Sequence, residues 1–201
     1  MYRKDLKDEA YTIRAKREGY PARSVYKLKE IDEKYKVFKK GNLVLDLGSS
    51  PGSWLIYISN KIGEKGRVVG VDLEDIKIPL SGNILFIKKD ILNTKPLDLL
   101  ILGKKYNVLV SDLSPKTSGL KSFDSAKSLE LSEKSLELAH NLLEKGGNFI
   151  CKIFEGESVS DFFKKVSDSF EFVKRFKPRA SFKKSKELYI IAKGFKKIYE
   201  D

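Results

Sequence analysis

Short apolar runs alternate with amphipathic segments along this chain of 201 residues. Continuous apolar runs predict buried strands, and apolar residues at helical spacing, such as Val25, Leu28 and Ile31, predict helices. We expect strands at residues 43–47, 67–71, 84–87, 106–112, 148–154, 170–176 and 187–195. Helices are expected at residues 24–35, 53–62, 97–102, 124–144 and 159–166, with Ser24, Asp124 and either Ser158 or Ser160 as caps. A glycine pair, Gly146-Gly147, should end the longest helix.

The order of these elements predicts the fold class. Strands that alternate with helices predict a mostly parallel sheet with helices on both faces. The last two strands are joined by a basic loop without a helix, which favours an antiparallel hairpin at one edge. We therefore expect an α/β fold with a mostly parallel seven-stranded sheet and an antiparallel C-terminal hairpin. The length fits a single domain over residues 1–201, in which residues 1–19 are a basic N-terminal extension.

The turn after the first strand carries the most specific motif. From residue 43 to residue 54 the sequence reads Leu-Val-Leu-Asp-Leu-Gly-Ser-Ser-Pro-Gly-Ser-Trp. Gly48 and Gly52 allow a sharp turn and the close approach of a ligand to the backbone. The helix that follows directs unpaired N–H groups at the same place. The second strand ends at Asp72, whose carboxylate can bind the two hydroxyls of a ribose, so the sequence predicts a site for a nucleoside-containing cofactor.

Two features separate this turn from a dinucleotide-binding turn. The sequence does not match G-x-G-x-x-G, and Asp46 at the mouth of the turn would repel a pyrophosphate but attract a cationic amino acid group. A tight turn without a ligand is a further alternative. The motif D-L-G-x-x-P-G is similar to the first motif of class I methyltransferases, which implies their Rossmann-like fold and S-adenosyl-L-methionine as cofactor. The expected cofactor-binding residues are Asp46, Gly48, Ser50, Pro51, Gly52, Trp54, Asp72, Asp90 and Asp112, with Asp90 accepting from the adenine amino group.

Positive charge is concentrated at the two ends of the sequence. The net charge is +12, residues 1–40 and 171–201 each carry +6, and the segment between them is neutral. Two basic ends with aromatic residues among the charges favour RNA lying across one face, if the ends meet in space. No apolar run is long enough to span a bilayer, and the single cysteine, Cys151, fits a reducing compartment. We therefore expect a cytoplasmic protein that binds RNA and no membrane.

Four ionisable residues have contexts that resemble one group of RNA-modifying enzymes. Lys27 lies in Ala-Arg-Ser-Val-Tyr-Lys-Leu, Asp112 in Ser-Asp-Leu-Ser-Pro, Lys152 in Cys-Lys-Ile-Phe and Glu187 in Ser-Lys-Glu-Leu-Tyr. Their order and contexts are similar to the catalytic Lys-Asp-Lys-Glu tetrad of RNA ribose 2′-O-methyltransferases. The closest resemblance is to the FtsJ/RrmJ family of large-subunit ribosomal RNA methyltransferases, and it covers residues 19–194. Ser53 departs from that family, which usually has glycine there.

This tetrad suits methyl transfer to a ribose hydroxyl. A 2′-hydroxyl is a weak nucleophile that must lose its proton as it attacks a sulfonium methyl group. A lysine can accept that proton only if burial or a nearby cation lowers its pKa. Lys152 lies on an internal strand and Lys27 could supply the cation, while Asp112 and Glu187 would orient the two ammonium groups. Such a transfer requires no metal ion.

The expected activity is therefore methylation of an RNA ribose 2′-hydroxyl with S-adenosyl-L-methionine. The resemblance implies a uridine of the large-subunit ribosomal RNA, in a ribosomal particle, as the target, and we expect a monomer. A nucleotide of a transfer RNA anticodon loop is an alternative target. Two other classes stay open, a base amino-methyltransferase and a non-catalytic RNA-binding factor of ribosome assembly. The amino-methyltransferase motif fits poorly, because its first proline is missing and Lys116 stands in place of its aromatic residue.

Overall fold

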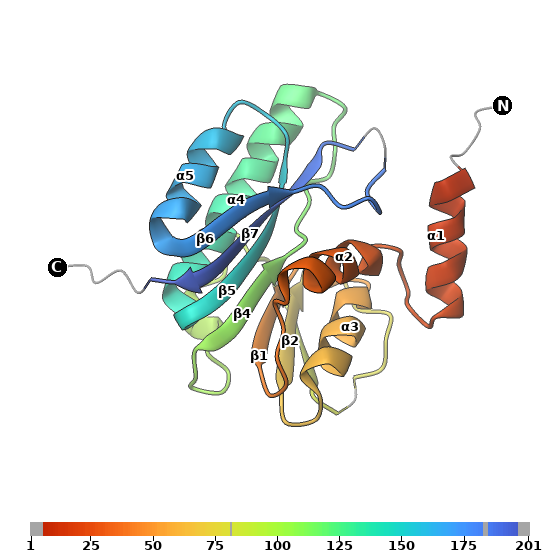
Figure 1. Cartoon of the computed structure of the whole chain (residues 1–201), viewed down its shortest axis with the longest axis vertical. Helices are drawn as coiled ribbons and strands as arrows, with labels where there is room; N and C mark the ends of the chain where they lie inside the picture. The colour runs from red at the N-terminus through yellow and green to blue at the C-terminus, as the bar shows by residue number, and fades with distance from the viewer. Residues whose placement is uncertain (1–5, 81, 183–184, 197–201) are drawn as a thin grey trace.

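Seven strands form one sheet in the computed structural model, which describes residues 6–80, 82–182 and 185–196 (Figure 1). The strands are β1 (Leu43–Leu47), β2 (Arg67–Asp72), β3 (Ile84–Lys88), β4 (Tyr106–Ser111), β5 (Leu143–Phe154), β6 (Phe170–Phe176) and β7 (Glu187–Phe195). Their order in the sheet is β3-β2-β1-β4-β5-β7-β6. Pairs among β1 to β5 are parallel, whereas β7 runs antiparallel to both β5 and β6. The predicted mostly parallel sheet with an antiparallel C-terminal hairpin is confirmed.

Helices cover both faces of the sheet (Figure 1). They are α1 (Leu6–Arg17), α2 (Val25–Tyr35), α3 (Ser53–Ile62), α4 (Lys121–Leu142), α5 (Val159–Ser169) and the single 3₁₀ turn η1 (Pro96–Leu99). On one face α2 and α3 pack on Val44, Val108 and Ile150, and on the other α4 and α5 pack on residues such as Leu45 and Phe149. Successive strand residues alternate between two apolar layers, which is why the strands read as continuous apolar runs. No described helix is both long enough and apolar enough to cross a bilayer.

The junction between α4 and β5 differs from the prediction. The helix starts at Lys121 and ends at Leu142, and the chain becomes extended at Leu143 without a glycine. Gly146-Gly147 lies inside β5, where Gly146 has a φ of 82° and the register with β4 is irregular. The glycine pair therefore shapes the start of a strand, because the buried Leu143 has already left the helix.

The predicted helix caps are also wrong in detail. Ser24 and Ser158 occupy N-cap positions, but neither side chain makes a capping hydrogen bond. Asp124 lies inside the first turn of α4, and its carboxylate accepts hydrogen bonds from the backbone N–H groups of Ser118 and Gly119. Asp124 therefore fixes the loop that precedes the helix.

The basic N-terminal extension is a helix packed on the body of the protein. Ala15 of α1 is 1% exposed, and the ring of Tyr11 lies 5.3 Å from that of Tyr26 on α2. The basic residues Arg3 and Lys4 lie outside the described residues. Packing of a few apolar side chains against α2 accounts for the position of a segment that has no clear apolar face in its sequence.

Candidate active site

A cavity of about 640 Å³ lies at the carboxyl ends of the parallel strands, as expected for an open α/β sheet. Five of the predicted cofactor residues line it, each at or just after the end of a strand: Gly48, Ser50, Asp72, Asp90 and Asp112. The first turns of α4 close its outer side with Phe123, Lys127 and Leu131. The volume lies within the range of sites for small ligands and cofactors.

The turn after β1 requires glycine at both predicted positions. Gly48 has a φ of 79°, and a Cβ there would lie 3.0 Å from the backbone nitrogen of Leu113. Gly52 has a φ of 110°, and a Cβ there would lie 2.8 Å from the side chain of Ile78. The sequence predicted a sharp turn with a ligand close to these glycines, but the nearest neighbours of both glycines belong to the protein itself. These glycines therefore let two loops pack against the turn.

Backbone N–H groups fix the carboxylates of Asp72 and Asp90 at the cavity. The two oxygens of Asp72 accept from the N–H groups of Ser50 and Glu74, both at 2.9 Å. Asp90 accepts from the backbone of Leu92 at 3.0 Å. A carboxylate oxygen can accept more than one hydrogen bond, so both groups keep acceptor capacity for a ligand.

Four other residues predicted to contact a cofactor do not line this cavity: Asp46, Pro51, Gly52 and Trp54. Asp46 is fully buried, and its two oxygens have no hydrogen-bond partner among the described residues. Burial, reinforced by the charges of Asp112 and Asp72, raises the pKa of Asp46 well above its ordinary value. The sequence placed Asp46 at the mouth of the turn, whereas in the structure it lies inside β1, is fully buried and does not line the cavity.

The charge of the cavity wall discriminates between classes of ligand. Five carboxylates line the cavity, those of Asp72, Glu74, Asp90, Asp112 and Glu130, against the two lysines Lys116 and Lys127, so the wall carries an excess of negative charge. Such a wall repels a pyrophosphate and attracts a cationic group. The described residues therefore fit a nucleoside that carries positive charge, and they do not fit a dinucleotide.

The four tetrad residues lie together as two ion pairs. Lys27 on α2 places its Nζ 2.7 Å from Oε2 of Glu187 at the start of β7. Lys152 on β5 places its Nζ 3.0 Å from Oδ1 of Asp112 and donates a hydrogen bond of 2.6 Å to the backbone oxygen of Asp112. The side chain of Lys27 is only 9% exposed and that of Lys152 only 4%, so little water reaches the two ammonium groups.

Tyr189 is a fifth member of this cluster that the sequence analysis did not assign. Its hydroxyl donates a 2.6 Å hydrogen bond to Oδ1 of Asp112. Burial alone would raise the pKa of Asp112, but the charges of Lys152 and Lys27 and the hydrogen bonds from Tyr189 and Lys152 outweigh it and lower that pKa. Burial next to Asp112 raises the pKa of Tyr189 well above its ordinary value, so Tyr189 remains a hydrogen-bond donor.

Strand register and one serine place the ammonium of Lys152. Lys152 pairs with Tyr189 across the β5–β7 ladder, so both side chains point to the same face. The backbone oxygen of Lys152 accepts a 3.0 Å hydrogen bond from Ser132 on α4. The spacing of Glu187 and Tyr189, two residues apart on one strand, could have indicated a shared face, but the partner across the ladder is visible only in the structure.

Two hydrogen bonds join the turn after β1 to the helix that carries Lys27. The indole N–H of Trp54 donates to the backbone oxygen of Ser24 at 3.0 Å. The hydroxyl of Ser53 accepts from the backbone N–H of Ala22 at 2.7 Å. The predicted cofactor residue Trp54 thus contacts α2, and the serine that departs from the family pattern supplies a second connection to the same segment.

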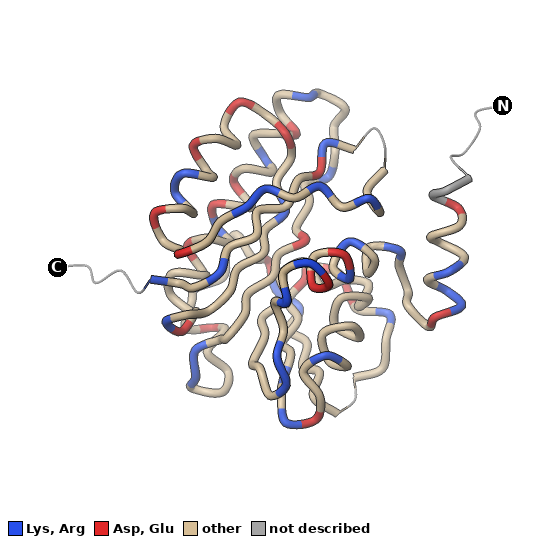
Figure 2. The backbone as a smooth tube through the Cα atoms, viewed as in Figure 1, with Lys and Arg blue, Asp and Glu red and all other residues tan. Residues whose placement is uncertain are grey.

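The basic N-terminal and C-terminal segments meet beside the tetrad. The guanidinium of Arg23 donates to the backbone oxygen of Ala180 at 2.6 Å and lies 4.2 Å from the ring centre of Phe182. Glu30 on α2 accepts from the N–H groups of Arg179 and Ala180. Figure 2 shows Lys and Arg positions along α1 and along the chain that enters the β6–β7 connection. The two basic segments therefore meet through residues 23–30 and 179–182, which is the contact that a shared basic surface requires.

Comparison with known proteins agrees with this geometry. The chain matches the FtsJ-like methyltransferase family over residues 20–195. A Lawsonia intracellularis protein named ribosomal RNA large subunit methyltransferase E is 44% identical over 190 residues, which cover 94% of this chain and 95% of the relative. A protein of the same name from Desulfatibacillum aliphaticivorans is 42% identical over 188 residues, covering 94% and 91%.

Solved structures show the same fold. A Plasmodium falciparum protein described as a candidate ribosomal RNA methyltransferase is 28% identical and superimposes with a TM-score of 0.75, covering 88% of this chain and 98% of the other. A candidate rRNA methylase from Clostridium thermocellum, 21% identical with a TM-score of 0.59, covers 84% and 97% and shares the fold. Together with the family match over nearly the whole described chain, these likenesses confirm the resemblance that the tetrad indicated: the chain belongs to the FtsJ-like methyltransferase family.

Proposed function

We propose that this protein transfers a methyl group from S-adenosyl-L-methionine to a ribose 2′-hydroxyl of large-subunit ribosomal RNA. One observation carries the proposal: Asp112 lines the acidic cavity and also pairs with the buried Lys152. A hydroxyl held at Lys152 would therefore lie next to a ligand in the cavity, which methyl transfer requires. The relatives named ribosomal RNA large subunit methyltransferase E support RNA as the acceptor.

The acidic cavity is the proposed site of the methyl donor. When bound, S-adenosyl-L-methionine supplies an electrophilic methyl group on a positively charged sulfur. Asp72 would accept from its ribose hydroxyls and Asp90 from its adenine amino group, because both carboxylates are held at the cavity by backbone N–H groups. Gly48 and Ser50 would form the edge of the turn against the amino acid part of the donor.

Lys152 is the proposed general base. An uncharged amine has two N–H donors and one lone pair, and Asp112 offers Lys152 two acceptors, its backbone oxygen at 2.6 Å and Oδ1 at 3.0 Å. If both N–H groups bond to Asp112, the lone pair is free to accept the proton of a ribose hydroxyl. Asp112 would then stabilise the lysine as its charge develops, and Tyr189 fixes Asp112 in the orientation that this requires.

Lys27 and Glu187 complete the site from the opposite side. Their ion pair joins α2 to β7. Lys27 also attracts Asp112, as the lowered pKa of Asp112 indicates. We assign Lys27 to binding of the RNA backbone or hydroxyl near the target, and Glu187 to holding the Lys27 ammonium in place.

The direct test uses large-subunit RNA that lacks ribose methylation, both free and within the ribosomal particle. With a labelled methyl donor, the label should appear in a 2′-O-methyluridine after complete digestion, because the proposed base Lys152 takes its proton from a ribose hydroxyl. Label in methylated adenine or cytosine would identify a base amino-methyltransferase. Label in transfer RNA alone would identify transfer RNA as the substrate. No label in any RNA would indicate that the protein is a non-catalytic RNA-binding factor.

Variants of Lys152 serve as the control for this test. Lys152→Ala should abolish transfer, and Lys152→Arg should also fail because a guanidinium stays protonated. Methyl-donor affinity measured by calorimetry should stay within a few fold in both variants, since Lys152 does not line the donor cavity. An active Lys152→Ala enzyme would remove Lys152 from the role of base.

Tyr189→Phe should slow methyl transfer while preserving the fold. The change removes only the hydroxyl that bonds to Asp112, so kcat should fall about fivefold, which corresponds to about 1 kcal/mol for one hydrogen bond. The matched control is Tyr57→Phe, which removes a buried 2.8 Å tyrosine–aspartate hydrogen bond to Asp32, away from the tetrad. The control should lower the melting temperature and leave kcat unchanged, and equal kcat values in the two variants would refute the role of Tyr189.

Asp72→Ala should weaken binding of the methyl donor. It removes the proposed acceptor of the ribose hydroxyls, so the affinity should fall by about 1–3 kcal/mol in calorimetry. Asp75→Ala is the control, because Asp75 lies three residues further on, does not line the cavity and pairs with Lys88 outside it. Unchanged donor affinity in Asp72→Ala would exclude the proposed contact.

Neutralising the shared basic surface should weaken RNA binding. Lys16 and Arg17 on α1 and Arg179 before β7 are exposed and have no ion-pair partner among the described residues. A triple serine variant should bind RNA more weakly, with a log–log salt slope smaller by about one unit for each phosphate that the protein no longer neutralises. The control is a triple serine variant at Lys65, Lys104 and Lys145, which removes the same number of positive charges at the opposite end of the sheet. Matching salt slopes in the two variants would show that the charge near the tetrad only solubilises the protein.

A further inference from the structure

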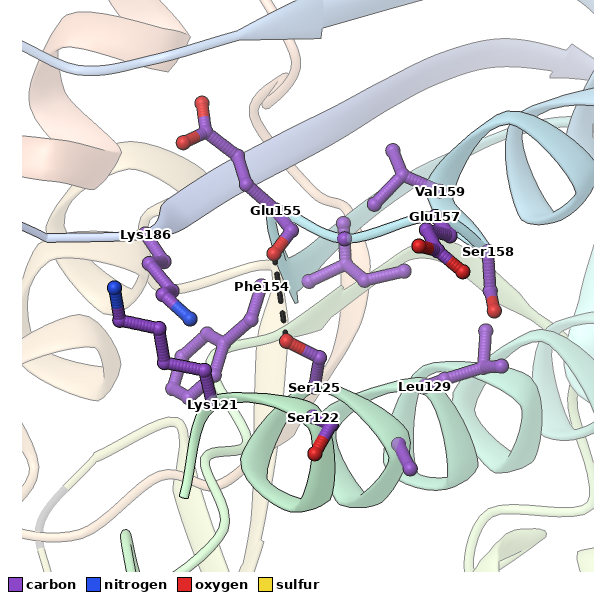
Figure 3. A pocket seen from close by; sticks show the side chains of 13 residues that line it. Lys121, Ser122, Ser125, Leu129, Phe154, Glu155, Glu157, Ser158, Val159 and Lys186 are labelled. Atoms are coloured by element: carbon purple, nitrogen blue, oxygen red, sulfur yellow. Dashed lines mark hydrogen bonds between the residues drawn. The ribbon is translucent and has the colours of Figure 1, made fainter. Parts of the chain in front are cut away.

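A second cavity lies beyond the end of β5 (Figure 3). Different residues of α4 line this cavity and the donor cavity. The second cavity has a volume of about 400 Å³ and lies between the first three turns of α4 and the turn that joins β5 to α5. The two cavities share no lining residue, because Ser122, Ser125 and Leu129 face this one and Phe123, Lys127 and Leu131 face the other. The start of α4 therefore divides two separate binding spaces.

The second cavity has a cationic end. Lys121 of α4 and Lys186, the residue before β7, extend their ammonium groups toward the same end (Figure 3). Neither lysine has an ion-pair partner among the described residues. Glu155 turns its carboxylate away from the cavity, where it pairs with Lys177 at 3.3 Å. Two ammonium groups at one end of the cavity favour a phosphate there.

The opposite end and the floor of the cavity suit the rest of a nucleotide. Ile153, Leu129 and Val159 contribute apolar surface, and the hydroxyls of Ser122, Ser125 and Ser158 lie around it. Glu157 lies beside Ser158 at the end away from the two lysines (Figure 3), where its carboxylate would repel a phosphate. The charge distribution thus allows one orientation, with the phosphate at the lysines and the base over the apolar floor.

The cationic end adjoins the tetrad along two strands. Lys186 directly precedes Glu187, and its backbone oxygen accepts a 2.8 Å hydrogen bond from the N–H of Glu155. Phe154, which lines the cavity, pairs with Glu187 across the β5–β7 ladder and follows Lys152 by two residues. A phosphate at the lysines is therefore next to the place where the target ribose would lie.

We propose that this cavity binds the nucleotide next to the methylated one in the substrate RNA. Its phosphate bonds to Lys121 and Lys186, and its base is turned out of the strand onto the apolar floor, as single-stranded RNA is commonly bound. The inference rests on the proposed function, since it takes RNA as the substrate. It adds that the RNA strand crosses the start of α4, with the methyl donor on one side of the helix and the neighbouring base on the other.

Four variants test this site: Lys121→Ser, Lys186→Ser, the double variant, and Ala126→Trp, which fills the cavity from its position on α4. Each lysine variant should bind the RNA about three- to tenfold more weakly, and the double variant should have a salt slope smaller by about 0.7, the value for one single-strand phosphate. Ala126→Trp should weaken RNA binding to a similar degree. Methyl-donor affinity should not change in any of them, because no varied residue lines the donor cavity.

Two controls match these changes in charge and position. The double variant Lys104→Ser and Lys145→Ser removes the same charge at the opposite end of the sheet, and Ala126→Ser leaves the cavity open. RNA affinity and salt slope equal to these controls would overturn the proposal. Because Lys186 adjoins Glu187, a defect confined to Lys186→Ser would also overturn it, since Lys121 lies on a different element and must share the effect.

The same measurements separate this inference from the proposed function. If the parent protein methylates ribose and the variants equal their controls, the function stands and the cavity is not a nucleotide site. If the parent transfers no methyl group to RNA, the proposed function fails, and the RNA affinities of the variants still decide whether the cavity binds a nucleotide.

Discussion

The candidate active site depends on one largely buried carboxylate, that of Asp112, which has partners on several sides. Asp112 is held by the ammonium of Lys152 and the hydroxyl of Tyr189, and it is attracted by Lys27. Burying a charged group is unfavourable unless partners replace its water, and removal of one partner leaves the others unsatisfied. The ends of β4, β5 and β7 and the first turn of α2 must therefore all reach their places for this carboxylate to remain ionised. The sheet order, with β7 inserted between β5 and β6, is what brings these elements together.

Most of the fold could be predicted because the central strands β1, β2 and β4 are buried on both faces and therefore appear as continuous apolar runs. The prediction failed where a local signal competed with burial. A glycine pair such as Gly146-Gly147 often ends a helix. Here the buried Leu143 has already left the helix, so the glycines lie within β5. Asp124 is a residue type that commonly caps helices, but its carboxylate accepts from N–H groups of the loop before α4 instead of those of the helix.

The candidate site was predictable to the extent that it follows strand ends and a known motif. Both sources locate Asp72, Asp90 and Asp112 at one edge of the sheet, and the structure places all three at one cavity. They do not reveal which way a side chain points: Trp54 bonds to the backbone of Ser24, Asp46 is fully buried, and neither lines the cavity. Tyr189 escaped notice because its contact with Asp112 depends on pairing between strands that are distant in sequence.

The ion pair between Lys27 and Glu187 joins residues 160 positions apart. Lys27 lies on the second helix of the chain, and Glu187 begins the last described strand. During synthesis the N-terminal helices and the turn after β1 leave the ribosome long before β7 is made. A nascent chain can thus form the turn after β1 while Lys27 still lacks its carboxylate, and Asp112 still lacks Tyr189. The four ionisable residues and Tyr189 can therefore come together only after β7 has been synthesised, so a nascent chain without β7 lacks two of the groups that surround Asp112.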